Sequence, residues 1–201
     1  IYYGDDVYMK GEGEGTFEVS RYASKVLITV TEIKVGENLT INITIDGNAD
    51  INATGEVDIF IDGKHYSVDI VDGKGSINNI SGLAAGKYDF TATYYGDGNY
   101  MKSENGSVAI VSLHVPNIIV NATNIKVGET EYINVTVRGD SDVPTGDVQI
   151  YVNGRYELVS LKNGTAIIPI NDLPASDEPY IIETIYYGDN TYDKAISKGS
   201  F

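Results

Sequence analysis

One block of residues, Tyr-Tyr-Gly-Asp followed three positions later by a further tyrosine, occurs three times in this chain of 201 residues. The copies begin at Tyr2, Tyr94 and Tyr186, so neighbouring copies lie 92 residues apart. A fixed spacing of this kind is typical of similar domains in tandem. Two other blocks recur in the same order at nearly the same spacing, 33–37 as 125–129 and 54–57 as 145–148.

Within each repeat, apolar and polar residues alternate, as in strands 39–46 and 133–138, and this period of two is typical of strands with one buried face. No segment has a sustained period of 3.6 residues, so we expect almost no helix. Pairs of Asp or Asn with Gly are typical of two-residue hairpin turns, because a type I′ turn needs positive φ at both central residues. We expect such turns to join three short strands of each repeat into a meander. These pairs are Asp62-Gly63, Asp72-Gly73, Asn153-Gly154 and Asn163-Gly164.

About seven short strands in each ~90 residues predict an all-β chain of tandem immunoglobulin-like β-sandwiches. We predict one sandwich at 23–111 and a second at 112–201, the second with its last strand truncated, while 1–22 would be the closing strand of a preceding repeat. Tyr88 and Tyr180 are predicted tyrosine corners, in which the phenol hydroxyl bonds to the chain upstream.

The connection between the repeats, 111–116, is short and contains no glycine, so we expect a stiff array. The first residues allow two interpretations. They are part of a longer array, or they donate a strand to the open sheet edge of another molecule's second domain, since an open edge invites strand addition. The candidate strand donor comprises Thr16, Phe17, Glu18 and Val19.

The formal net charge of −15 would repel phosphate backbones, which excludes nucleic acid as a partner. Cysteine is absent, and no apolar run approaches the ~20 residues that span a bilayer, so we expect no membrane insertion in this segment. His65 and His114 do not recur in the other repeat, and neither stands in a pattern that suggests a nucleophile and its base. We therefore expect no enzyme, no cofactor and no metal. The recurring Gly-Asp could offer oxygen ligands to calcium, but an Asx turn explains it with fewer assumptions.

Eight asparagines stand in Asn-x-Ser/Thr sequons without an intervening proline, and they predict N-glycosylation of an exported chain. Asn42 and Asn134 occupy equivalent strand positions in the two repeats, on the polar face. The sequence thus predicts an extracellular glycoprotein. The glycosylation candidates are Asn38, Asn42, Asn52, Asn79, Asn105, Asn121, Asn134 and Asn163.

Taken together, the Val-Gly-Glu turn, the Thr-Gly-x-Val strand start, the x-Gly hairpins, the Ala-Gly-x-Tyr rise and the Tyr-Tyr-Gly-Asp block resemble one family. It is that of the bacterial and archaeal immunoglobulin-like repeat domains of large surface proteins, as in the adhesin-like proteins of methanogenic archaea. The resemblance implies surface display, tandem stalks and adhesion or wall association, and it carries over no catalytic residue. The longer loop 173–179 departs from the pattern next to Tyr180.

The leading interpretation is a non-catalytic repeat segment of a cell-surface adhesin-like protein, which extends or presents a binding region. One alternative is a filament or wall-layer subunit that assembles by strand complementation. Another is a glycan or wall-polymer binding module whose ligand contacts the equivalent tyrosines Tyr3, Tyr95 and Tyr187. The expected partners are accordingly an unknown surface ligand (glycan, wall polymer or protein) and neighbouring repeats or copies of the chain.

Overall fold

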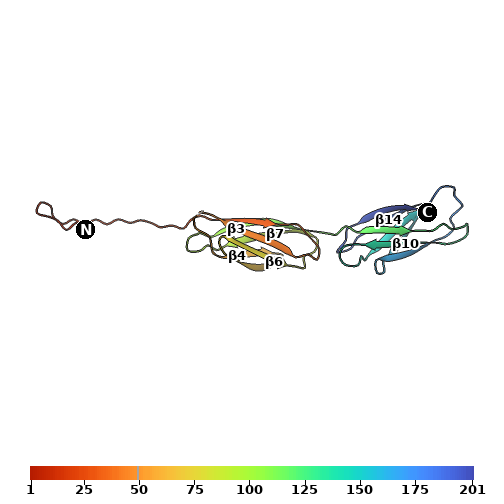
Figure 1. Cartoon of the computed structure of the whole chain (residues 1–201), viewed down its shortest axis with the longest axis horizontal. Coiled ribbons are helices and arrows are strands. Elements are labelled where there is room, and N and C mark those ends of the chain that lie inside the picture. The colour runs from red at the N-terminus through yellow and green to blue at the C-terminus, as the bar shows by residue number, and fades with distance from the viewer. Residues whose placement is uncertain (49) are drawn as a thin grey trace.

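A computed structural model describes residues 1–48 and 50–201 and shows two β-sandwiches in series (Figure 1). The described residues contain strands and turns but no helix, which confirms the predicted all-β class. The strands of the first sandwich are β1 (Lys25–Val30), β2 (Ile33–Lys34), β3 (Leu39–Asp46), β4 (Gly55–Ile61), β5 (Lys64–Ile70), β6 (Lys74–Ile80), β7 (Gly86–Tyr94) and β8 (Ser103–Ser112). Those of the second are β9 (Asn117–Asn121), β10 (Glu131–Arg138), β11 (Asp147–Val152), β12 (Arg155–Ser160), β13 (Thr165–Ile170), β14 (Ile181–Tyr186) and β15 (Ala195–Ser200).

Each sandwich consists of a small and a larger sheet. In the first, the order β1-β3-β6 faces the order β2-β8-β7-β4-β5, and in the second, β9-β10-β13 faces β12-β11-β14-β15. Neighbouring strands are antiparallel except β2 and β8, which run parallel with Ile33 opposite Val111. Strand β15 lies at the edge of its sheet and is shorter than β8, its counterpart in the first sandwich.

The alternating strands supply the two cores. Leu39, Ile41 and Ile43 of β3 are buried in one core, and Ile133 and Val135 of β10 are buried in the other. Each such side chain contributes roughly 1.5–3 kcal/mol by its transfer out of water. The residues between them face solvent, so the period of two read from the sequence fixes which side of each strand is inside.

The predicted three-stranded meander is wrong. Strand β6 pairs with β3 in the opposite sheet, although the turn before it has the expected positive φ values of 51° at Asp72 and 74° at Gly73. Beyond this turn, Gly75 passes so close to the preceding strand that an added Cβ would lie 2.7 Å from Val68 Cγ1. Strand β13 of the second sandwich joins β10 in the same way with Ala166 at the equivalent position, so the crossing itself does not require a glycine. The turn signal alone does not say which sheet the strand joins.

Both predicted tyrosine corners are confirmed. The Tyr88 hydroxyl donates to the carbonyl of Ala84 at 3.0 Å, four residues upstream. The Tyr180 hydroxyl donates to the carbonyl of Pro174 at 2.8 Å, six residues upstream. The longer loop of the second repeat therefore changes the reach of the corner but keeps the bond.

Candidate functional site at the junction between the sandwiches

In the Tyr-Tyr-Gly-Asp blocks of the two sandwiches, which begin at Tyr94 and Tyr186, the aspartate accepts hydrogen bonds from its own loop and from a second loop. One carboxylate oxygen of Asp97 accepts from the backbone N–H groups of Asn99 and Tyr100, at 2.7 and 2.8 Å. Its other oxygen accepts from the N–H and the hydroxyl of Thr54, at 2.8 and 3.2 Å. Asp189 repeats this arrangement with Thr145, Thr191 and Tyr192. Hydrogen bonds of the fold therefore occupy these carboxylates, as expected of an Asx turn.

These bonds show in the acidity of the groups. Burial raises the pKa of Asp97, but the bonds from Thr54, Asn99 and Tyr100 lower it more, and the net result is a pKa of about 2. The pKa of Asp189 is lowered for the same reasons. Tyr94 is fully buried beside Asp97, and burial together with that negative charge raises its pKa to about 12. The ionised aspartate of the block thus connects two loops by hydrogen bonds.

The last tyrosine of the block covers a glycine in both sandwiches. The ring of Tyr192 lies against Gly139, where any Cβ would overlap it, and its hydroxyl donates to the carbonyl of Asp142 at 2.7 Å. The same hydroxyl accepts from the N–H of Ser141 at 2.8 Å. Tyr100 covers Gly47 in the first sandwich. The turn 139–142 is thereby held in place beside the block.

The block also receives the chain that enters each sandwich. The N–H of His114 donates to the carbonyl of Thr191 at 2.9 Å, and the N–H of Asp193 donates to the carbonyl of His114 at 2.9 Å. Tyr22, 92 residues earlier, makes the same two backbone bonds with Asn99 and Met101. The block is therefore a socket for one residue of the preceding connection.

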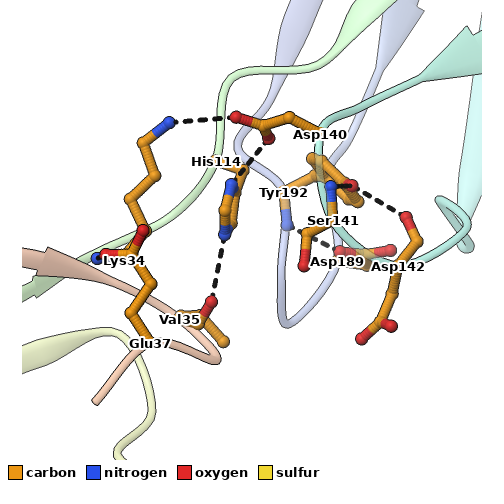
Figure 2. A network of polar contacts seen from close by, with 9 residues as sticks. All are labelled: Lys34, Val35, Glu37, His114, Asp140, Ser141, Asp142, Asp189 and Tyr192. Atoms are coloured by element: carbon orange, nitrogen blue, oxygen red, sulfur yellow. Dashed lines mark hydrogen bonds and ion pairs between the residues drawn. The ribbon is translucent and has the colours of Figure 1, made fainter.

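The side chain of His114 joins the two sandwiches (Figure 2). Its Nε2 lies 3.0 Å from the carbonyl oxygen of Val35 in the first sandwich, and its Nδ1 lies 2.6 Å from Oδ1 of Asp140 in the second. Oδ2 of Asp140 lies 3.2 Å from Nζ of Lys34, again in the first. The imidazole is 5% exposed and packs on the Tyr192 ring at 5.7 Å between centroids. Three side chains and one backbone carbonyl thus bridge the junction.

Both ring nitrogens of His114 face oxygen atoms, the carbonyl oxygen of Val35 and a carboxylate oxygen of Asp140. The bond from His114, followed by that from Lys34, lowers the pKa of Asp140. The junction is therefore a short polar network rather than an apolar contact.

Sequence reasoning missed this network. A signal for it was nevertheless present. Tyr22 and His114 are equivalent positions with different residues, and so are Asn48 and Asp140, which stand 92 residues apart. These two positions, among those at which the repeats differ, meet at the junction.

The predicted glycosylation sites are all accessible. Every one of the eight sequon asparagines is exposed, and Asn42 and Asn134 lie on the outward faces of β3 and β10 as predicted. The side chains of Asn52 and Asn105 already make hydrogen bonds, to Asp72 and to the carbonyl of Val26. Occupancy of these sites stays a prediction.

The candidate strand donor is exposed. Residues 12–21 form no strand within the described residues, and the segment extends away from the first sandwich (Figure 1). Phe17 and Val19 are 88% and 87% exposed. Strand donation itself stays a prediction.

Among the proposed ligand-contacting tyrosines, Tyr95 and Tyr187 do face solvent while their neighbours Tyr94 and Tyr186 are buried. Each exposed ring carries a lysine over its face, Lys102 at 5.5 Å from the Tyr95 centroid and Lys194 at 5.4 Å from that of Tyr187. Cation–π contact therefore already occupies one face of these rings.

Within residues 1–48 and 50–201, no three histidine or acidic side chains gather in a way that could hold a metal ion. His65 is exposed and contacts Asp58, far along the chain from His114. In the same described part of the chain, none of the elements is a helix of the length and apolar character that crossing a membrane requires.

Residues 26–112 match the family model of the bacterial Ig-like domain, group 3. The chain matches no curated protein. Solved structures similar to it include the titin domains Z1Z2 in complex with telethonin, at 17% identity over 91% of this chain and 96% of that one, with a TM-score of 0.48. The fibronectin(III)-like modules of Clostridium thermocellum CbhA are 15% identical over 87% and 91%, with a TM-score of 0.34. The Yersinia pseudotuberculosis adhesin InvE is 12% identical over 88% and 58%, with a TM-score of 0.38.

The resemblance to bacterial immunoglobulin-like domains is thus confirmed over the first sandwich, and the second sandwich repeats its motifs.

Proposed function

We propose that this chain is a non-catalytic segment of a cell-surface adhesin-like protein, in which a stiff series of sandwiches extends or presents a binding region. The observation that carries the proposal is the junction. His114 lies in the short connection and bonds to Val35 of the first sandwich and to Asp140 of the second, so its side chain holds the two sandwiches together. A stalk that presents a distant region needs such fixed joints, because a flexible linker lets the ends approach.

The experiment that tests display uses antibodies raised against this segment on intact cells of the native host. Labelling of intact cells, at the level found after permeabilisation, is the expected result. A cytoplasmic protein, labelled only after permeabilisation, serves as the control. Labelling of the segment only in permeabilised cells would contradict surface display.

Stiffness is tested separately by small-angle X-ray scattering of the chain. We expect the maximum dimension of two sandwiches in line, and a scattering curve that a single interdomain orientation fits. A curve that requires a broad distribution of orientations would contradict the stalk.

A second candidate function is assembly by strand complementation, favoured by the exposed side chains of Phe17 and Val19 and by the position of β15 at the edge of its sheet. In an added strand both side chains would point to the same face, toward the core of another molecule. Sedimentation velocity at rising concentration tests it. Association that is lost in Phe17→Asp but kept in Met9→Asp, which is equally exposed outside the donor, would support assembly, and a monomer at every concentration would exclude it.

Glycosylation belongs to the same proposal, because eight exposed sequons suit an exported chain. Native protein should lose mass on enzymatic removal of N-linked glycans. An unchanged intact mass would show that the sequons are unused.

A further inference from the structure

The outward faces of the two larger sheets carry exposed ring pairs at equivalent positions. In the second sandwich, Tyr151 of β11 lies opposite Tyr156 of β12, with ring centroids 4.6 Å apart and planes inclined by 39°. In the first, Phe60 of β4 lies opposite His65 of β5, at 4.7 Å and the same inclination. The residue types differ, but the arrangement of two rings side by side in solvent is retained.

A hollow lies beside each pair. The one next to Tyr151 and Tyr156 has a volume of about 280 Å³ and is further lined by Gln149, Glu183 and Ile185. The one next to Phe60 has a volume of about 430 Å³, and Gly106 contributes to its floor because it has no side chain to fill the space. Concave spaces with apolar walls and a few polar groups are typical of small-ligand sites.

The polar groups around the second hollow can bond hydroxyl groups. The carbonyl oxygen of Gln149 accepts from the Tyr187 hydroxyl at 2.7 Å, and this bond turns the amide NH₂ away from Tyr187 as a donor. Glu183 supplies a carboxylate acceptor, with Nζ of Lys198 at 3.4 Å. Donor, acceptor and ring therefore stand together on one face of β11 and β14.

These features select a ligand with both hydroxyl groups and apolar C–H faces. An aromatic face is electron-rich and attracts the polarised C–H groups of a sugar ring. The net charge of −15 disfavours anionic polymers. A quaternary ammonium ligand needs rings that surround it, whereas Tyr151 and Tyr156 pack on each other.

The surface around the rings is also open. None of the eight sequon asparagines lies on β11, β12, β14 or β15, so glycans attached at the sequons would leave this face uncovered. Tyr156 is 65% exposed and Leu158, on the same strand, 59%.

We propose that the outward face of the sheet β12-β11-β14-β15 binds a neutral, extended polysaccharide, with a hexose ring stacked on Tyr151 and Tyr156 and its hydroxyls bonded to Gln149 and Glu183. This site is independent of the stalk role, since a stiff array exists with or without it.

A glycan array tests the proposal. It carries neutral β-linked hexose oligosaccharides together with uronic-acid and sialylated oligosaccharides, and binding of the whole chain is measured to each. We expect the neutral oligosaccharides to be retained, and the double variant Tyr151→Ala, Tyr156→Ala to bind about tenfold or more weakly, since loss of a stacking platform removes at least ~1.4 kcal/mol. Tyr132→Ala is the matched control, because Tyr132 is an equally exposed tyrosine of the same sandwich on the opposite sheet.

A second variant separates binding from folding. Tyr151→Phe, Tyr156→Phe retains the rings and the cross-strand pair, so it should bind within about threefold of the wild type. Circular dichroism melting of each variant checks that the second sandwich is folded. Retention of no neutral oligosaccharide, retention of the anionic ones only, or equal binding by a folded alanine variant would each overturn the proposal.

Discussion

Replacing Asp97 with asparagine tests the hydrogen bonds by which the Tyr-Tyr-Gly-Asp block connects two loops. The substitution keeps the shape, and the remaining carbonyl oxygen can still accept from Asn99 and Tyr100. The second oxygen becomes an NH₂ group that faces the N–H and the hydroxyl of Thr54, at the present distances of 2.8 and 3.2 Å. The NH₂ group and the backbone N–H of Thr54 are then two donors that face each other, and the charge that strengthened both bonds is gone.

The pKa values give the magnitude. The pKa of Asp97 is about 2, against an ordinary 3.8, and each pKa unit corresponds to 1.36 kcal/mol. The ionised carboxylate therefore stabilises the first sandwich by roughly 2 kcal/mol, an upper value because this side chain is half-buried and solvent screens part of the interaction. A loss of this size lowers the melting temperature of a ~90-residue domain by about 10 °C.

The same reasoning fixes the sign of the pH dependence. Because the pKa of Asp97 is lower in the folded state, its contribution is fully present above pH 3.8 and is lost as the pH falls toward 2. The wild-type first sandwich should thus lose stability across that window. Asp97→Asn should lack this part of the loss, because the amide does not titrate.

Urea denaturation at several pH values, followed by circular dichroism, measures both effects. The second sandwich is an internal control, because Asp97→Asn leaves the equivalent hydrogen bonds of Asp189 intact. In Asp189→Asn, by contrast, the unfolding transition of the second sandwich should shift and that of the first should not. The reasoning is refuted by a variant with the wild-type midpoint at pH 7, or by one that retains the full acid sensitivity between pH 4 and 2.

Three further changes test other parts of the structure. His114→Phe removes both bonds across the junction and should broaden the distribution of interdomain orientations in X-ray scattering, and an unchanged distribution would contradict the role of His114. Gly139→Ala should destabilise the second sandwich by about 1–3 kcal/mol in urea titrations, since its Cβ would overlap the Tyr192 ring, whereas Gly98→Ala, which has open space, should not. Tyr180→Phe should cost about 1 kcal/mol by removing the bond to Pro174, and a wild-type melting curve would contradict that role.

Local signals made much of the fold predictable. Alternation in β3 and β10 placed their buried faces, and the Asp-Gly and Asn-Gly pairs located hairpin turns with positive φ. The path of β6 was not predictable in this way, because a turn signal carries no information on which sheet the next strand joins. The close approach of Gly75 to Val68 and Ile70 is likewise recognisable only in the structure.

The functional sites were likewise predictable only where a local sequence pattern determines them. The exposed sequons and the outward tyrosines followed from strand alternation, which is a local property. The bonds of His114 depend on Val35 and Asp140, 79 residues before it and 26 after it, and on how two domains meet. Tyr151 and Tyr156 were likewise missed, because their packing depends on strand register rather than on a motif.

The comparison of Tyr22 with His114 shows how the array sets its own geometry. Both residues enter the same socket with the same two backbone bonds, so the block determines where the connection attaches. Tyr22 remains 46% exposed, while His114 is buried because Val35 of the preceding sandwich covers it. The block therefore holds the connection in place, and the pair formed by residue 114 and residue 140 fixes the angle between the sandwiches. Because residues 114 and 140 lie outside the block, we expect substitutions at these two positions to change the junction without altering the fold of either sandwich.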